Sequence, residues 1–192
     1  MKAITLYPEW AWAIVHLDKR TENRTWAAWR DLQGHRIGIH AGRAFGGKVS
    51  RPLAGRELVE AFETSGVLDM ARRAGWDVSL EEFEDLGPGV LVRFEKDVFA
   101  FGPQRVELRA EDVHRGALVG SSVYEGAHRN DPGSERRWGV PGQLGWSLSH
   151  VLRLREPATV RGAQGLWEVP PELADRLCKV DHNVHPFAAR GA

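Results

Sequence analysis

The segment HLDKRTENRTW, residues 16 to 26, brings two cations and a carboxylate close together in the sequence. Lys19 and Arg24 can both hold a phosphate, the arginine through its planar fork of donors and the lysine as a point charge. Glu22 lies between them and can accept a hydrogen bond from an exocyclic amine such as that of cytosine. Because these groups together could bind the phosphate and the base of one nucleotide, the segment predicts a nucleotide site.

Tryptophans near this segment can supply an aromatic wall. Trp10 falls on the apolar stripe of the helix predicted to precede the segment, so we expect it in the core. Trp12 lies off that stripe and is the better stacking candidate. Trp26 shares one face of a predicted strand with Glu22 and Arg24, because alternate strand residues point the same way. Stacking on an aromatic ring contributes about 1–3 kcal/mol per base, so Trp12 and Trp26 are predicted binding residues.

The same groups could also catalyse a reaction. For RNA cleavage, Lys19, His40 and Tyr7 would supply an acid, a base and charge stabilisation. Alternatively, Glu22 would take up a proton while Lys19 stabilises an oxyanion. A lysine base needs a pKa well below its reference value of about 10.4. Burial would lower the pKa of Lys19 and an ionised Glu22 would raise it, so the sequence leaves both options open.

Structural roles for these residues are the alternative to function. Glu22 and Arg24 can simply pair with each other, which contributes only about 0–1 kcal/mol when the pair is exposed. His40 can equally be a structural histidine with satisfied hydrogen bonds.

The loop at residues 43 to 53 is rich in glycine and in basic residues. It lacks the spacing of a Walker phosphate loop. We therefore expect Arg43 and Lys48 to form a basic rim that contacts the RNA backbone. Near the C-terminus, Cys178, His182 and His185 could ligate a metal, but a fourth ligand is not evident, and we expect neither a metal nor a cofactor.

Composition limits the class of protein. The chain has 192 residues, with 26 basic and 26 acidic side chains, so no overall cationic field attracts it to nucleic acid. A single cysteine, Cys178, excludes an internal disulfide and suits a reducing cytoplasm. No apolar run reaches the roughly 18 residues of a membrane helix, and MKAITLYPEW lacks the apolar core of a secretion signal. We expect a cytoplasmic protein with no membrane partner.

The predicted elements alternate between short strands and few helices. A helix begins at Pro8, ends near Asp18, and separates the first two strands. A second helical region is expected to break near Ser65-Gly66. The remaining segments are a charged exposed loop and an irregular tail at about 180–192. Strands are predicted at 2–7, 20–26, 36–42, 90–101, 105–109, 117–124, 145–154 (ended by Pro157) and 165–169, helices at 56–76 and 171–178, and the exposed loop at 125–137.

Three segments in this order resemble the ASCH domain, a branch of the PUA-like superfamily. They are Pro8-Glu9-Trp10-Ala11, Lys19-x-x-Glu22-Asn23-Arg24 and Ile39-His40-Ala41. The later segment from Gly145-Trp146 through Leu154, with Pro157 and Gly165-Leu166-Trp167, also resembles the closing strands of the family. The resemblance covers roughly residues 4–45 and 138–170, and the middle, about 50–135, is interpreted as an insertion. Leu17 departs from the family pattern, which usually has a glycine two residues before the lysine.

The resemblance implies a single domain over 1–192. Its expected fold class is α+β, a small, mostly antiparallel PUA-like β-barrel with flanking helices and a helical insertion. It implies binding of RNA or a nucleotide in a cleft beside the Lys-x-x-Glu-x-Arg motif. Some relatives are similar to ribonucleases, and one small bacterial type hydrolyses acylated cytidine, with a threonine matching Glu22. The alternatives are a hydrolase that uses the same cleft, either a ribonuclease or an amidohydrolase on a modified nucleoside, and a protein–protein adaptor.

Overall fold

The fold is α+β, with two β-sheets and four α-helices among the described residues. A computed structural model describes residues 1–83, 89–98, 102–131 and 137–178. The predicted irregular tail at 180–192 lies outside these residues, as do residues 132–136 of the predicted 125–137 loop. Each helix in the described part of the chain is too short or too polar to cross a membrane.

The larger sheet has six strands in the order β2-β8-β7-β3-β1-β9. The pair β1/β3 is parallel and the other pairs are antiparallel, so the sheet is mixed. Its strands are β1 (Lys2–Leu6), β2 (Thr21–Arg24), β3 (Arg36–Ala41), β7 (Ala117–Arg129), β8 (Leu144–Thr159) and β9 (Leu166–Glu168).

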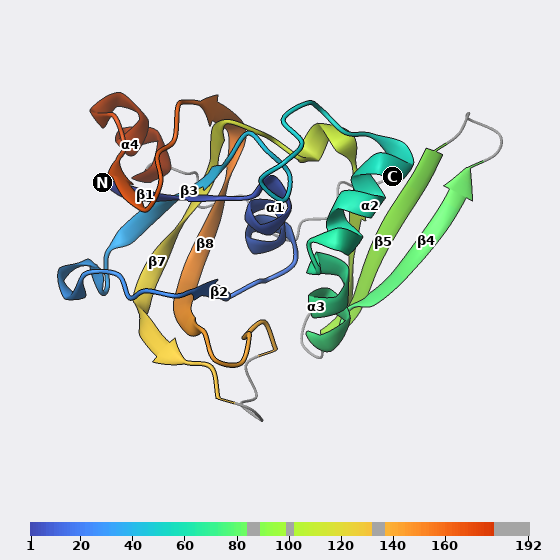
Figure 1. Cartoon of the computed structure of the whole chain (residues 1–192), viewed down its shortest axis with the longest axis horizontal. Coiled ribbons are helices and arrows are strands. Elements are labelled where there is room, and N and C mark those ends of the chain that lie inside the picture. Colours follow the sequence, from blue (N-terminus) through green and yellow to red (C-terminus); the bar gives the residue numbers. More distant parts are fainter. Residues whose placement is uncertain (84–88, 99–101, 132–136, 179–192) are drawn as a thin grey trace.

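This sheet curls around helix α1 (Pro8–His16) into a half-barrel (Figure 1). Pro8 begins the helix as predicted, at the position where its missing N–H costs nothing. The strands β2 and β9 end the sheet without pairing to each other, so the expected barrel does not close. The curl still brings β2 close to β1, and Arg24 Nη2 donates to the carbonyl of Thr5 at 3.2 Å.

The chain reverses sharply after α1. Asp18 adopts a left-handed conformation, with φ of 56°, which aspartate tolerates better than most residues. Leu17, at the position of the family's usual glycine, has a φ of −111° and is completely buried. The Trp76 indole donates to its carbonyl at 3.0 Å. This turn directs the next residue, Lys19, into the protein interior.

The second sheet has three antiparallel strands in the order β4-β5-β6. Helices α2 and α3 lie between it and the half-barrel (Figure 1). They separate at Gly66, where the break was predicted and φ is +80°. One core cluster includes Trp12 of α1, Phe62 of α2 and Phe94 of β5, so this region packs directly on α1. The elements are α2 (Gly55–Thr64), α3 (Val67–Arg73), β4 (Asp77–Phe83), β5 (Gly89–Val98) and β6 (Gly102–Leu108).

Several elements differ from the sequence-based prediction. Strand β4 was not predicted, and β7, within the expected 50–135 insertion, pairs with β3 and β8 of the main sheet. β7 also continues through Arg129, so residues 125–129 are not a loop. Pro157 lies inside β8, next to an irregularity in its pairing with β7, where a missing N–H is tolerated. The remaining elements are α4 (Pro171–Cys178) and 3-10 turns at Arg30–Leu32 and Ala110–Asp112.

Candidate functional site

A cleft of about 930 Å³ opens where β1 leads into α1. Its floor is β2, and its walls are the end of β3 with the following residues, the loop 160–165 between β8 and β9, and single side chains such as Met70 of α3. Six of the predicted site residues line it, namely Tyr7, Lys19, Glu22, Arg24, His40 and Arg43. Three predicted binding residues, Trp12, Trp26 and Lys48, do not line it.

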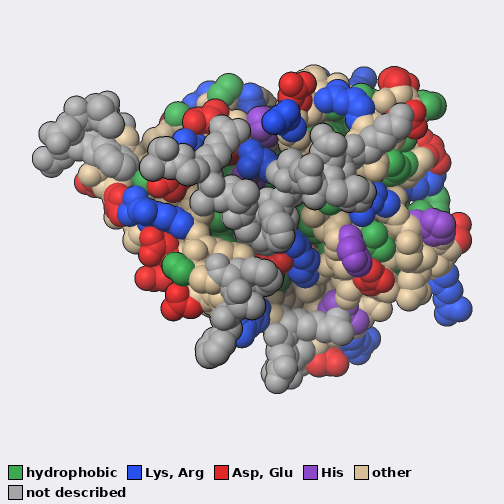
Figure 2. All heavy atoms as spheres, turned by 180° about the vertical axis from the view of Figure 1, so that it is seen from behind, with side chains coloured by type: hydrophobic (Ala, Val, Ile, Leu, Met, Phe, Trp, Pro, Cys, Tyr) green, Lys and Arg blue, Asp and Glu red, His purple; other side chains and the backbone are tan. Residues whose placement is uncertain are grey.

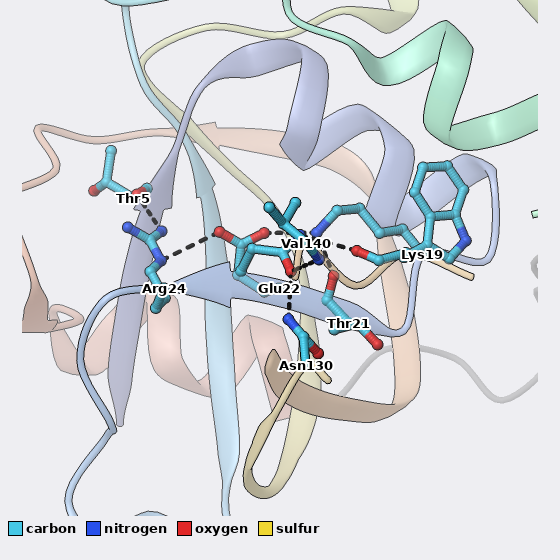
Figure 3. Close-up of polar contacts among 9 residues, drawn as sticks. Thr5, Lys19, Thr21, Glu22, Arg24, Asn130 and Val140 are labelled. Atoms are coloured by element: carbon cyan, nitrogen blue, oxygen red, sulfur yellow. Dashed lines mark hydrogen bonds and ion pairs between the residues drawn. The ribbon is translucent and has the colours of Figure 1, made fainter. Parts of the chain in front are cut away.

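Lys19, Glu22 and Arg24 form a connected group on the cleft floor, the cleft triad (Figure 3). Lys19 Nζ donates to Glu22 Oε2 at 2.7 Å. Arg24 Nε lies 3.2 Å from Glu22 Oε1, an ion pair without hydrogen-bond geometry, because Nε has no hydrogen-bond partner. Glu22 is therefore held between two cations, and 10% of its side chain remains exposed.

Lys19 was predicted to hold a phosphate, but it lies beneath the surface of the cleft. Its side chain is completely buried. Its ammonium donates to the carbonyl of Thr21 at 2.5 Å and to Glu22, and it lies 5.4 Å from the ring centroid of Trp10. Burial lowers the pKa of Lys19, and the neighbouring Glu22 opposes that effect. Lys19 thus orients Glu22 and cannot itself reach a bound phosphate.

Trp12 does not have the stacking role predicted for it, whereas Trp10 packs against the core as expected but also lines the cleft. Trp12 is 2% exposed and packs in the core, stacked on His16 and edge-on to Phe62. Trp10 is half-buried and lines the cleft over Lys19. The reason is that α1 is buried on almost every side, so it has no polar face to oppose an apolar stripe. Trp10 is the indole available to stack on a ligand.

Trp26 was predicted to share the cleft face with Glu22, but it does not. Strand β2 ends at Arg24, so the alternation does not extend to Trp26. Its ring packs edge-on against the ring of Trp146, at 4.8 Å between centroids, and its carbonyl accepts from the Trp146 indole at 3.0 Å. Trp26 is therefore partly buried and packs against the core that contains Trp146.

His40 lies in the cleft wall but is only 2% exposed. Its Nε2–H donates to the carbonyl of Val160 at 3.0 Å, and its Nδ1 is buried with no hydrogen-bond partner. Burial lowers the pKa of His40, which favours the neutral ring. A side chain at Gly162 would collide with the imidazole, so this glycine allows the loop 160–165 to cover His40. A substrate has no direct access to this ring.

The rim of the cleft carries exposed aromatic and cationic groups. Tyr7 is 48% exposed, and Arg43 is exposed at the end of β3. Lys48 is exposed but lies outside the cleft, because the loop turns back at a bridge between Phe45 and Val49. Arg161 is an exposed cleft residue that sequence reasoning missed, although its position in the glycine-containing segment VRGAQG was a usable signal.

Asn23 attaches a distant segment to the cleft floor. Its Nδ2 donates to the carbonyl of Trp138, and its Oδ1 accepts from Val140 N and from Asn130 Nδ2, each at 2.9 Å. Val140 and Gln143 of the same segment line the cleft. Asn23, the variable position inside Lys-x-x-Glu-x-Arg, is thus a positioning residue that sequence reasoning did not single out.

Glu9, between Pro8 and Trp10 in α1, anchors the loop that follows β3. It is completely buried, and its Oε1 accepts from Gly46 N at 2.9 Å. Burial raises the pKa of Glu9, while that hydrogen bond lowers it. The contact fixes the loop that carries Arg43.

A metal-binding group is not found within the described residues. Cys178 is exposed there, while His182 and His185 lie outside the described part of the chain. Chemically, the cleft offers an oriented carboxylate acceptor, an indole and a tyrosine, and two exposed guanidinium groups. Neither a protein-family model nor a curated protein sequence matches the chain.

Proposed function

We propose that this protein is an ASCH-type, PUA-like domain that binds RNA or a nucleotide in the cleft above Glu22. The observation that carries the proposal is the composition of the cleft. An ionic carboxylate faces a space of about 930 Å³, within the roughly 300–1,000 Å³ typical of ligand sites. An indole lies beside that carboxylate, and cationic side chains lie at the rim.

Each part of a nucleotide has a counterpart in the cleft. Glu22 accepts hydrogen bonds from the base, and Trp10 or Tyr7 stacks on its face. Arg43 and Arg161 bind phosphate, for which arginine provides matching pairs of donors. Neither arginine makes an ion pair with another described residue, so both remain available to a ligand.

The surface charge favours local recognition over a broad electrostatic interface. On the face seen in Figure 2, outside its grey segments, acidic and basic side chains are intermixed rather than gathered into one basic patch. This agrees with the formal net charge of zero. Affinity for a polyanion would then come from the few cations at the cleft, and we expect a shallow dependence on salt.

Binding is favoured over hydrolysis by the positions of Lys19 and His40, two of the four proposed catalytic residues. The ammonium of Lys19 is buried and engaged by Thr21, Glu22 and the Trp10 ring. His40 is covered by the loop 160–165, and its Nε2–H is used by a backbone carbonyl. Neither group has the access to substrate that a general acid or base needs.

The test is calorimetric titration of the chain with a mixed-sequence RNA oligonucleotide and with each 5′-mononucleotide. We expect binding that weakens in Arg161→Ala and is unchanged in Arg155→Ala, a matched exposed arginine on β8 that does not line the cleft. Analysis of the same mixtures for products separates the hydrolase alternative. Absence of binding to every nucleotide and RNA would refute the proposal and leave the adaptor alternative.

A further inference from the structure

We infer that the cleft selects guanine among the bases, with Glu22 accepting both the N1–H and the N2–H of its Watson–Crick edge. This inference rests on the proposed function and goes beyond it, because it names the base and the residue that reads it. It follows from the hydrogen-bond capacity that the cleft triad leaves unused.

Glu22 has acceptor capacity left on both carboxylate oxygens. A carboxylate offers about four lone-pair positions, two on each oxygen. In the described structure, Oε2 accepts one hydrogen bond, from Lys19, and Oε1 accepts none, since Arg24 Nε faces it only as an ion pair. At least one acceptor position on each oxygen is therefore free, which suits a ligand with two parallel donors.

The neighbouring cations keep Glu22 an acceptor. Arg24 Nε lies 3.2 Å from Oε1, and Lys19 Nζ lies 2.7 Å from Oε2. Glu22 thus pairs with two cations as a carboxylate, and a carboxylate accepts hydrogen bonds but donates none. A base that presents a lone pair to Glu22 would face repulsion instead of a hydrogen bond.

Guanine is the common base whose edge offers two adjacent donors, N1–H and N2–H, followed by an acceptor, O6. Adenine and cytosine each place a ring acceptor next to their single exocyclic amine, and uracil has one donor between two acceptors. Beside Glu22, the Arg24 guanidinium has donors left over, because only its Nη2 makes a hydrogen bond among the described residues. Arg24 can therefore donate to O6.

A guanidinium ligand, such as an arginine side chain of a peptide, would also present two donors to Glu22. The rim disfavours that cationic ligand, because Arg43 and Arg161 line the same cleft. The rim instead suits the phosphate of a guanine nucleotide or of a guanine within RNA.

The experiment is calorimetric titration of the unaltered protein with 5′-GMP, IMP, AMP, CMP and UMP under one buffer condition. IMP differs from GMP only by the missing N2 amine. Loss of one hydrogen bond to a charged acceptor corresponds to about 10- to 100-fold in Kd, so IMP should bind at least about tenfold more weakly than GMP. AMP, CMP and UMP should bind at least as weakly as IMP.

A variant assigns this preference to Glu22. In Glu22→Gln one acceptor oxygen becomes a donor amide, and the ratio of the Kd values for IMP and GMP should fall to about one or two. Arg155→Ala should keep the ratio of the unaltered protein. Circular dichroism of Glu22→Gln establishes that the variant is folded, and the IMP comparison on the unaltered chain needs no variant.

The outcomes separate the two levels of the proposal. Equal binding of GMP and IMP, or tighter binding of another mononucleotide, would overturn the guanine assignment while leaving the cleft as a nucleotide site. No binding of any mononucleotide or RNA would overturn the proposed function as well. Tighter binding of L-argininamide than of GMP would assign the cleft to a cationic ligand and overturn both.

Discussion

The two sheets of this protein each hold a carboxylate–cation cluster, and the two clusters differ in what they face. In the cleft triad, Lys19 is fully buried and the side chain of Glu22 is 10% exposed at the floor of a large cleft. On β5, Arg93 lies between Glu81 of β4 and Glu107 of β6. We refer to Glu81, Arg93 and Glu107 as the sheet ladder.

The sheet ladder shows what such residues do without a ligand site. Its side chains are 17% to 38% exposed, and its members pair across neighbouring strands on the face opposite the buried Val92 and Phe94. None of them lines the cleft. Residue type alone therefore does not identify a binding site, and the distinguishing feature is unused acceptor capacity that faces an open volume.

The cleft triad and the sheet ladder should differ most in how much they contribute to the free energy of unfolding. Lys19→Met leaves Glu22 buried beside Arg24 with one cation fewer, and loss of one partner of a buried ion pair costs about 3–5 kcal/mol in the free energy of unfolding. Arg93→Met in the sheet ladder should cost less, because its partner carboxylates Glu81 and Glu107 are 38% and 26% exposed and can be solvated when the arginine is removed. Urea denaturation of both variants measures the difference, and equal losses would mean that the two clusters are energetically alike.

The two tryptophans of α1 should separate binding from stability. Trp10→Ala should weaken nucleotide binding by about 1–3 kcal/mol, because it removes the stacking surface in the cleft. Trp12→Ala should instead lower the free energy of unfolding by about 3–5 kcal/mol, because it empties part of the core. Calorimetry and urea denaturation of both variants form the check. A larger loss of binding in folded Trp12→Ala than in Trp10→Ala would contradict this assignment.

The rim should show a smaller effect. Arg43→Ala should reduce nucleotide affinity by about 1 kcal/mol, typical of one hydrogen bond, since Arg43 lines the cleft. Lys48→Ala, in the same loop but outside the cleft, should change affinity by less than the error of the calorimetric titration. If both variants weakened binding equally, the loop would act as one diffuse basic surface.

Added salt should change the loss in the free energy of unfolding differently for the two clusters, by a few tenths of a kcal/mol. Screening weakens exposed charge pairs more than buried ones, so the stability lost in Arg93→Met should shrink between about 0.05 and 0.5 M NaCl. The loss in Lys19→Met should stay nearly constant, because its ammonium is excluded from solvent. Urea denaturation at both salt concentrations tests this, and a stronger salt response of the Lys19 variant would indicate that water reaches the triad.

Local patterns in the sequence predicted much of the fold. Pro8 and the break near Gly66 are effects of neighbouring residues, and both are found in the structure. Strand β4, DVSLEEF, lies at the edge of a sheet. It was missed because its many polar residues leave too few apolar residues to show a clear alternation of apolar and polar positions. The open half-barrel depends on pairing between distant strands, which periodicity does not report.

The candidate site was predicted in part. Glu22 and Arg24 are neighbours on one strand, so their proximity followed from the sequence. The burial of Lys19 depends on the left-handed turn at Asp18. The position of Trp10 in the cleft depends on which sides of α1 the other elements cover. Arg161 reaches the cleft from the far end of the chain. These features are tertiary, so spacing alone could not provide them.

One measurement tests the central claim most directly, namely that a nucleotide enters the space between Glu22 and Trp10. The eight tryptophans each give an indole N–H signal in a ¹⁵N–¹H NMR spectrum, assignable by single substitutions. On titration with 5′-GMP, the Trp10 signal should shift with saturation while the buried Trp12 signal stays in place. If the Trp10 signal did not move at saturating nucleotide, or if only the exposed Trp29 responded, the cleft would not be the binding site.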